Sequence, residues 1–490
     1  MKITVLNGSP KGATSVTMQY VHYVQRAFPE HDLEIVHVAQ RIRRLEGSEQ
    51  AWQEVIAQVR ASDGILWAFP LYILHVHAHY KRFIELIWER GTEDAFAGRY
   101  AATLSTSIHF FDNTAHNYIQ AICDDLEMKY VGSFSPEMRD LLGEEGQSKL
   151  VTFAKSLFGA IENRVPTLRS YAPVTARDYQ YLPGAEQEPV SPSGQRILIV
   201  TDAEAHQTNL LRMIDRFDAS FSQEIEAVNL RDLDIKGSCL GCLQCGYDNR
   251  CAYEGKDDYI EFYNSKVRSA DILVFAGAIR DRYLSSTWKT FFDRSFFNTH
   301  APSLLGKQFG FIISGPLSQN SNLRTILEAW VEIQRSNLAG FVTDECGDPA
   351  EIDGLVQNLA GSLVRFAETG YIKPQTFLGV GGTKVFRDDI WGRLRTVFQA
   401  DHRAYKQMGI YDFPQKEWGI RALNMVTPFL FRIPRFRQEF AARIKEQMVA
   451  PYQKVLESVE PDNPTHPDPA PGATGIPAVS TQGSRTMSSS

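Results

Sequence analysis

Short apolar runs alternate with amphipathic stretches along the first 165 residues. The apolar runs have the length and composition of buried strands, and they lie at 3–6, 33–38, 64–68, 100–104 and 129–134. Stretches with a helical period separate them, most clearly at 14–28, 51–61 and 80–88. Strands and helices that alternate at this spacing predict a parallel sheet covered by helices on both faces.

The alternation stops after this region and then starts again. Residues 166–195 are rich in proline and polar residues, which is typical of a linker between domains. Apolar runs return at 196–200, 271–275 and 309–313, and a helix-like stretch, DDYIEFYNSKVRSA, precedes the second of them. We therefore expect one domain at 1–165 and another at 196–372.

Two segments suggest that these domains repeat one fold. The first domain contains SDGILWAFPLYI and then HYKRFIEL, and the second contains ADILVFAGAIRDRYLSSTWKTFFDR. Each reads as a small residue and Asp, an apolar strand, an irregular loop and an aromatic helix with a lysine. The similarity predicts a tandem repeat.

The C-terminal part of the chain differs from both domains. Residues 373–459 are aromatic and locally basic, and they predict a helical extension. One interpretation is that it packs on the second domain. Another is that it docks on a membrane surface or a partner, because arginines flank aromatic residues at Phe429, Phe431, Arg432, Arg435, Phe436 and Arg437. Pro428 and Pro434 interrupt a long helix and favour the first interpretation. Residues 460–490 lack the apolar content of a core and predict disorder.

Composition and charge exclude several classes of protein. The 490 residues are 43% hydrophobic and carry a net charge of -7, which does not favour nucleic-acid binding. The opening MKITVLNGSP lacks the features of a signal peptide, and we expect no transmembrane segment. Six cysteines do not make a secreted disulfide framework. These features predict a cytoplasmic enzyme.

Four of the six cysteines lie together in the run SCLGCLQCGYDNRC. They are Cys239, Cys242, Cys245 and Cys251. This spacing suits the corners of an iron–sulfur cubane, with the fourth ligand arriving slightly later. A structural zinc site more often divides its ligands into two distant pairs. Four reduced thiols that bind no metal are the alternative.

The loop after the first strand has the composition of an anion site. A strand, the small residues of 7–15 and a helix start place backbone amides and a helix N-terminus at one point. The hydroxyls of Ser9, Thr14 and Ser15 can donate hydrogen bonds there, and Lys11 can add charge. The alternative is a helix capped by Ser or Thr after a turn.

Two further loops end at the same edge of the predicted sheet. Pro70, Leu71 and Tyr72 follow the third strand, and a Pro-x-Tyr loop can press an aromatic residue against a flat ring. Polar groups follow the fourth strand at Ser105, Thr106, Ser107 and His109. Ligands of open parallel sheets bind beyond the carboxyl ends of the strands, where these loops lie.

Other isolated candidates are weaker. The alternating His75, His77 and His79 would share a face only in a strand, and they lie between a loop and a helix. We interpret them as residues of the helix start rather than as metal ligands. Cys123 and Cys346 are isolated in the sequence and are interpreted as structural.

The three loops of the first domain resemble those of the NADPH-dependent FMN reductase group. The matching pieces are LNGSPKGATS, FPLY with its lysine-containing helix, and STSIHFFDNT. The second domain resembles the iron–sulfur flavoprotein branch of the same superfamily in CLGCLQC with its later cysteine, KDDYIEFYNSKVRSADILVFAG and KTFFDRS. The resemblance covers most of residues 1–345 and implies two tandem flavodoxin-like, doubly wound α/β sheets. In similar proteins two such units associate, and the cysteine segment of one approaches the flavin of the other.

The two domains depart from the family pattern in complementary ways. The first has the phosphate loop but no cysteine run. The second has the cysteines, but Asp202 and Glu204 in its loop would repel a phosphate, and Gly277–Arg280 lacks both the proline and the aromatic residue. We therefore expect one FMN, in the first domain, with the four cysteines facing it.

These expectations combine into a flavin-dependent oxidoreductase. NAD(P)H would supply electrons to FMN, with or without a [4Fe–4S] cluster, and the acceptor would be a small molecule or a protein. The alternative is an iron–sulfur flavoprotein that carries electrons between partner proteins without its own small-molecule substrate. A redox sensor or scaffold whose second domain has lost catalysis is a third hypothesis. The chain would act alone, as a homo-oligomer or with a redox partner protein.

Overall fold

Two parallel sheets of five strands form the framework of the protein. The computed structural model describes residues 1–185 and 187–458. The first sheet comprises Lys2–Asn7 (β1), Asp32–Val36 (β2), Gly64–Pro70 (β3), Tyr100–Thr106 (β4) and Lys129–Phe134 (β5). The second comprises Ile197–Thr201 (β6), Glu226–Asn229 (β7), Ile272–Ala278 (β8), Gln308–Ser314 (β9) and Asn337–Thr343 (β10).

Both sheets have the same topology. Their orders are β2-β1-β3-β4-β5 and β10-β9-β8-β6-β7, and every strand pair is parallel. Numbered within its own domain and read from its other edge, the second sheet is also ordered 2-1-3-4-5, which is the flavodoxin-like order. The predicted fold class, two tandem flavodoxin-like sheets, is therefore confirmed.

Two edge strands were not predicted from the sequence. β7 is the short segment EAVN, in which Glu226 and Ala227 are exposed. β10 contains a glycine and is only partly buried. An edge strand pairs on one side only, so neither sequence carries the continuous apolar run of a central strand.

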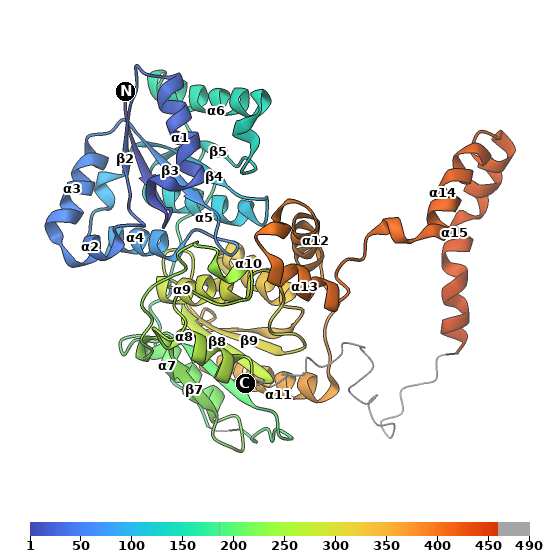
Figure 1. Cartoon of the computed structure of the whole chain (residues 1–490). Coiled ribbons are helices and arrows are strands. Elements are labelled where there is room, and N and C mark those ends of the chain that lie inside the picture. The colour runs from blue at the N-terminus through green and yellow to red at the C-terminus, as the bar shows by residue number, and fades with distance from the viewer. Residues whose placement is uncertain (186, 459–490) are drawn as a thin grey trace, which may run out of the picture. The chain divides into compact units, whose positions relative to one another are not determined.

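Helices cover both faces of the first sheet (Figure 1). They are Val16–Ala27 (α1), Ile42–Gly47 (α2), Glu49–Arg60 (α3), Ala78–Glu89 (α4), Asp112–Asp125 (α5) and Glu144–Glu162 (α6). α1 and α6 share one face, where Met18, Val21 and Leu150 pack against Val5 and Leu66. This core holds the carboxyl ends of β1, β3 and β4 at one edge.

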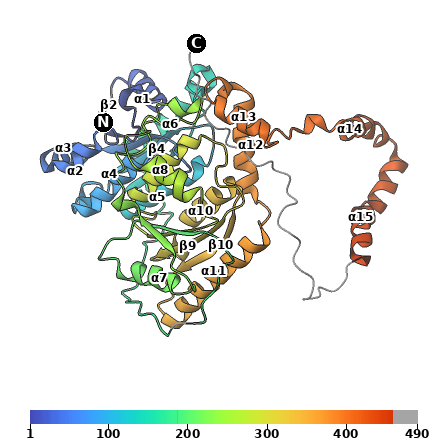
Figure 2. The same cartoon turned by 60° about the horizontal axis from the view of Figure 1, so that its bottom comes forward.

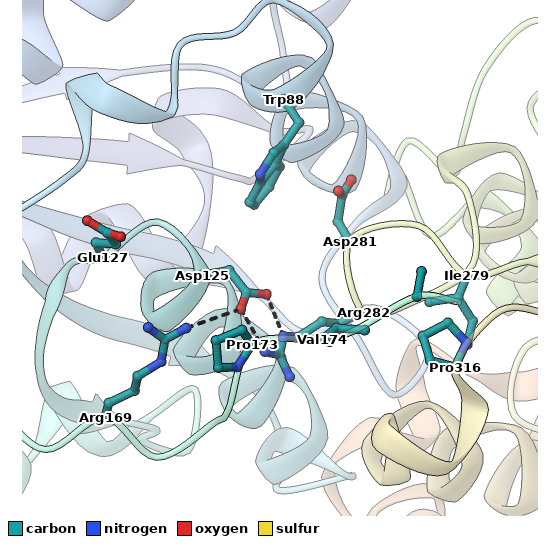
Figure 3. A pocket seen from close by; sticks show the side chains of 11 residues that line it. Trp88, Asp125, Glu127, Arg169, Pro173, Val174, Ile279, Asp281, Arg282 and Pro316 are labelled. Carbon is teal, nitrogen blue, oxygen red and sulfur yellow. Dashed lines mark hydrogen bonds and ion pairs between the residues drawn. The ribbon is translucent and has the colours of Figure 1, made fainter. Parts of the chain in front are cut away.

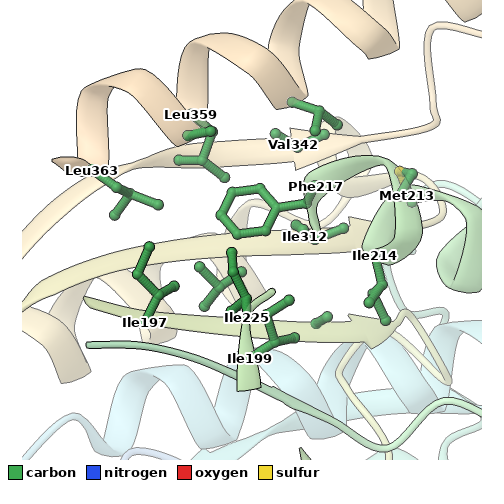
Figure 4. Packing of buried hydrophobic residues seen from close by; sticks show 14 of the residues in the cluster. Ile197, Ile199, Met213, Ile214, Phe217, Ile225, Ile312, Val342, Leu359 and Leu363 are labelled. Atoms are coloured by element: carbon green, nitrogen blue, oxygen red, sulfur yellow. The ribbon is translucent and has the colours of Figure 1, made fainter. Parts of the chain in front are cut away.

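The second domain repeats this arrangement. Its helices are Thr208–Asp218 (α7), Tyr259–Phe262 (α8), Ser286–Arg294 (α9), Ser321–Ile333 (α10) and Pro349–Thr369 (α11). α7 and α11 cover one face, and Figure 4 shows Phe217 of α7 beside Leu359 of α11. The predicted helix over 257–270 is α8 followed by a π-helical turn, Tyr263–Val267.

The segment between the two domains is held against the second domain. The hydroxyl of the buried Tyr181 donates a hydrogen bond to Asp353 of α11, and the same carboxylate accepts from the backbone N–H of Gly184 at 2.8 Å. Farther upstream, the Thr175 N–H donates to the Gln319 side chain at 2.9 Å. The proline-rich segment is therefore ordered by side chains of the domain that follows it.

The C-terminal region is helical, as expected. It comprises Phe377–Trp391 (α12), Gln399–Gln407 (α13), Trp418–Leu430 (α14) and Pro434–Glu457 (α15). The described residues up to Arg403 form one compact unit, and residues 404–458 belong to a second. Within the first unit α12 packs on α10 (Figure 2). The ring of Phe386 on α12 contacts that of Phe110, with centroids 4.2 Å apart. The predicted disorder of 460–490 concerns residues outside the described ranges. Among the described helices, none combines the length and apolar character needed to cross a membrane.

Candidate functional site

The loop from β1 to α1 is a tight turn built on its own side chains. The Asn7 side chain accepts from the Ser9 N–H at 2.9 Å and donates to the Gly12 carbonyl at 3.2 Å. Gly12 has a φ of +59°, and a Cβ there would lie 2.4 Å from the Gln40 side chain. The positive φ favours glycine at this position, and a Cβ would also displace the end of the Gln40 side chain.

The predicted phosphate donors in this loop are not equivalent. The hydroxyl oxygens of Ser9 and Ser15 accept from the N–H groups of Lys11 and Met18, so each keeps its own hydrogen to donate. Thr14 instead donates its hydroxyl hydrogen to the Lys11 carbonyl at 2.8 Å. Ser9 and Ser15, together with the N-terminus of the twelve-residue helix α1, have the donor groups that a phosphate needs, but both side chains are buried, so the phosphate site remains a prediction.

The predicted ring loop after β3 forms a two-residue turn. Tyr72 and His75 exchange backbone hydrogen bonds at 2.9 and 3.0 Å, and Ile73 and Leu74 between them have φ values of 37° and 59°. A positive φ is strained for such side chains, and strain of this kind is found at functional sites. Pro70, Leu71 and Tyr72 are each partly exposed at this edge.

The hydroxyls after β4 are used inside the protein. Ser105 bonds to the His116 ring at 2.7 Å, and Thr106 bonds to the Thr17 hydroxyl at 2.7 Å. The Ser107 hydroxyl accepts from the His109 N–H at 2.9 Å, while the His109 ring lies 3.1 Å from Asp112. The predicted cofactor contacts of these four residues therefore remain a prediction, and the half-exposed His109 ring is the most accessible of them.

The four cysteines of the run line one small cavity. It has a volume of about 20 Å³, and its other walls include the apolar Leu240, Leu243, Phe296 and Phe297. All four thiols are free. Burial raises the pKa of Cys239 and the pKa of Cys245 to about 12 each. Within residues 1–185 and 187–458, no group of three or more His, Cys, Asp or Glu side chains is arranged to hold a single metal ion.

The chemistry of this donor set is that of an iron–sulfur site, because four thiols surround one cavity with apolar walls. The cavity itself has room for about one water, so the loop would have to widen around a cluster. Arg294 also lines the cavity and is buried, but its guanidinium donates two hydrogen bonds to Asp257 at 2.6 and 2.9 Å, which neutralises most of its charge. Whether the cysteines bind metal remains a prediction.

The cysteine loop lies directly on the first domain. The His77 ring nitrogen Nε2 donates to the Cys239 carbonyl at 2.8 Å. At Gly241, which has a φ of +63°, a Cβ would lie 2.2 Å from the Tyr72 hydroxyl and 2.8 Å from Cε of Lys11. Burial, then the neighbouring Cys239, raises the pKa of Tyr72. The structure thus brings together the predicted phosphate loop, the ring loop and the cysteine run.

The domains are joined by α4 and α9, which pack against each other (Figure 1). Nζ of Lys81 on α4 donates to the Arg280 carbonyl at 2.9 Å, and Nζ of Lys289 on α9 donates to the Tyr72 carbonyl at 3.0 Å. The two lysines therefore each hold the strained loop of the opposite domain.

A carboxylate of each helix likewise accepts a hydrogen bond from the start of the opposite helix. The Asp293 carboxylate accepts from the Ala78 N–H at the start of α4 at 2.8 Å, and Glu85 accepts from the Ser286 N–H at the start of α9 at 2.6 Å. Sequence reasoning did not single out these residues. A signal was present, because a lysine precedes an acid by four residues in both KRFIE and KTFFD.

The three histidines lie at the start of α4, as expected. His77 caps the helix, with its side chain accepting from the His79 N–H. Burial lowers the pKa of His77 to about 3 and the pKa of His79 to about 4. His75 is buried between the rings of Tyr118 and Tyr283. They are structural residues of the domain junction.

The second domain carries acids where the first carries its phosphate loop. Asp202 is buried and accepts from the Ser285 hydroxyl, and burial raises the pKa of Asp202 to about 6. Glu204 pairs with Arg231 at 2.6 Å. A cavity of about 590 Å³ lies beside them, and α4 contributes Arg82 and Glu89 to its lining.

A further cavity lies at the domain junction, and no pattern in the sequence predicted it. It has a volume of about 410 Å³, and Figure 3 shows Trp88 and Asp281 on its walls. Arg282 holds Asp125 there with two hydrogen bonds and is buried. In the part of the chain that the structure describes, no predicted cofactor residue lines this cavity.

Comparison with known families confirms the resemblance of the first domain. Residues 1–136 match the family described as NADPH-dependent FMN reductase. The match spans the three loops at the carboxyl edge of the first sheet. No curated protein matches the chain.

Solved structures similar to this chain each span about one domain. An NADH:FMN oxidoreductase in its apo form is 19% identical, covering 33% of this chain and 89% of its own, with a TM-score of 0.28. An oxidoreductase from Corynebacterium diphtheriae is 15% identical, covering 33% and 98%, with a TM-score of 0.28. An FMN-dependent NADH-azoreductase from Bacillus anthracis str. Ames Ancestor, solved in complex with FMN, is 13% identical, covering 34% and 99%, with a TM-score of 0.23.

Proposed function

We propose that this chain is an FMN-dependent NAD(P)H oxidoreductase with one FMN in its first domain and a [4Fe–4S] cluster in the cysteine cavity. The observation that carries the proposal is the position of Gly241, whose Cα closely approaches both Lys11 and Tyr72. A redox centre held by the cysteines would then adjoin the loops that hold the flavin.

The first domain would bind FMN at two places. Ser9, Ser15, Lys11 and the N-terminus of α1 would hold the phosphate, and the exposed Thr14 would support the loop through its bond to the Lys11 carbonyl. Pro70, Leu71 and Tyr72 would flank the ring, with Ser105, Thr106, Ser107 and His109 on the neighbouring loop. When bound, FMN supplies the redox chemistry, and the protein positions and tunes it.

The cysteine cavity would prepare its ligands through burial. A raised pKa keeps Cys239 and Cys245 protonated until metal binds, so cluster assembly would release protons and would be favoured by higher pH. The apolar walls would exclude water from the cluster. When bound, the cluster supplies one-electron chemistry.

Iron analysis tests the metal site. The protein is purified without oxygen, reconstituted with iron and sulfide, and assayed for iron, sulfide and flavin. Wild type should bind about four irons per chain, and Cys242→Ala/Cys245→Ala should bind almost none while keeping its flavin. The matched control is Cys123→Ala/Cys346→Ala, which changes the two cysteines outside the run and should retain the iron. Equal iron in wild type and the Cys242/Cys245 variant would reject the cluster.

A second candidate function is electron transfer between proteins without a small-molecule substrate. It is favoured by exposure at the outer side of the cavity, where Cys242 is exposed and Leu240 and Leu243 are 44% and 40% exposed. Such a surface offers a partner protein direct access. Steady-state oxidation of NADH and NADPH with quinones and dyes separates the candidates, because a carrier would show negligible turnover.

A further inference from the structure

Helix α14 exposes apolar side chains around most of its circumference. Its six most prominent apolar residues, each more than half exposed, are Trp418, Ile420, Leu423, Met425, Val426 and Phe429. Arg421 is the single charged residue among its thirteen. Arg421, Asn424 and Pro428 follow one another at intervals of three and four residues and share one side of the helix, so the rest of the circumference forms a broad apolar face that needs an apolar environment.

The helix is joined to a strongly basic segment. Between Trp418 and Lys445 the chain carries five arginines and one lysine against one carboxylate, Glu439, although the whole chain has a net charge of -7. The ring of Phe431 contacts those of Phe436 and Phe440 at 5.4 and 4.9 Å, which ties the end of α14 to the start of α15. We call residues 418–445 the C-terminal hairpin.

We infer that the C-terminal hairpin docks on the surface of an anionic phospholipid bilayer. Thirteen residues are too few to span the apolar core of a bilayer, which takes about 20. α14 therefore lies in the interface, with Trp418 and Phe429 among the headgroups and acyl chains. The exposed arginines, such as Arg432 and Arg435, attract the lipid phosphates.

Charge and shape favour lipid over the other occupants. A second copy would bring the same excess of cations against this one, which is unfavourable. Another protein face, including the acidic remainder of this chain, would cover only one side of α14. Lipid can cover most of the apolar circumference and also neutralise the arginines, so one partner satisfies both observations.

Vesicle flotation with the full-length protein tests this inference. The vesicles contain phosphatidylcholine alone or phosphatidylcholine with phosphatidylglycerol, and each is assayed at low and high salt. Wild type should float with the anionic vesicles, bind the neutral ones much more weakly and be released by salt. Arg432→Glu/Arg435→Glu should weaken binding about fivefold or more for each arginine lost. Trp418→Ser/Phe429→Ser should weaken it about tenfold or more.

Matched controls change similar residues elsewhere. Leu142→Ser/Leu168→Ser removes two leucines that are 82% and 81% exposed, and Lys155→Glu/Arg164→Glu reverses two exposed charges. Both should bind vesicles like wild type. Circular dichroism and urea denaturation confirm that every variant is folded.

Three outcomes would overturn the inference. The first is an absence of flotation, and the second is equal binding to neutral and anionic vesicles or by wild type and hairpin variants. The third is a dimer in sedimentation velocity that Trp418→Ser/Phe429→Ser dissociates, which would make a second copy the occupant. None of these readouts uses the flavin or the cluster, so a failure here leaves the proposed function untouched.

Discussion

Gly8 in the first domain and Asp202 in the second occupy the same place, one residue beyond the first strand of their sheets. The registers show this equivalence, because Asn7 pairs with Ala68 and Thr201 pairs with Ala276 at matching points of β3 and β8. At Gly8 a Cβ would lie 2.6 Å from the Tyr80 ring. The first domain therefore needs glycine at this point, and the second has a buried carboxyl group.

The comparison shows how one fold can keep its architecture and change its site. Both domains retain the strained two-residue turn after the third strand, with Ile73 and Leu74 in one and Asp281 and Arg282 in the other. Both retain the lysine that holds the opposite turn. The loops before α1 and α7 differ, because they contribute to ligand chemistry rather than to the packing of the domains.

The acids at the domain junction also differ in their electrostatics. Burial alone would raise the pKa of Glu85, but Lys81, Ser286 and Arg82 outweigh it and lower that pKa. Burial raises the pKa of Asp293 and lowers the pKa of Lys289, because their mutual contact and the bonds from Ala78 and Ser238 to Asp293 only partly offset it, and no second cation pairs with Asp293 among the described residues. The stability of the domain junction should therefore depend more strongly on Lys289 than on Lys81.

The largest expected effect comes from breaking the pair of Lys289 and Asp293. Lys289→Met leaves Asp293 buried without its cation and should lower the free energy of unfolding by about 3–5 kcal/mol. Urea denaturation measures it. Lys81→Met should cost less, because Arg82 also pairs with Glu85 at 3.0 Å. Lys289→Met/Asp293→Leu should recover much of the loss, and equal losses for the two lysine variants would contradict the proposed asymmetry.

The next effect concerns the acid that replaces Gly8. The pKa of Asp202 is about 6 in the folded protein against an ordinary 3.8, so its stability contribution is present below about pH 4 and is lost as pH rises through 6. In wild type this group should lower the free energy of unfolding by at most about 3 kcal/mol as pH rises through this window, and Asp202→Asn should remove that decrease. Unfolding curves of variant and wild type at pH 4 and pH 8 measure the difference. The exposed Asp178→Asn is the control, and a constant difference at both pH values would show that Asp202 does not titrate in this window.

The smallest effect concerns the phosphate loop itself. Ser9→Ala removes a donor to the proposed phosphate and should weaken FMN binding by about 1.5–3 kcal/mol. Thr14→Ala should have less effect, because its hydroxyl donates to the Lys11 carbonyl. Thr201→Ala/Thr208→Ala in the second domain should leave flavin affinity unchanged. Flavin titration followed by fluorescence measures all three. Unchanged FMN affinity in Ser9→Ala would contradict the proposed phosphate site in the first domain.

Local patterns were sufficient to predict the framework of this protein. The central strands, the loop of 7–15, the cysteine run and the acids at Asp202 and Glu204 were all visible in the sequence. Each of these features is defined by residues close together in the sequence, because buried strands are recognised by short apolar runs and turns by a few adjacent residues. The edge strands β7 and β10 were missed because half of their environment is solvent.

Only the tertiary structure decided how these parts meet. The bond from His77 to Cys239 joins residues 162 positions apart, and that from Lys289 to Tyr72 joins residues 217 apart. The sequence places the hydroxyls of Ser105 and Thr106 at the edge where a ligand is predicted, but only the structure shows their present partners, His116 and Thr17. A residue type shows which bonds a side chain can make. Which partner it has depends on the packing of distant segments, and that is set by the burial of the whole domain junction.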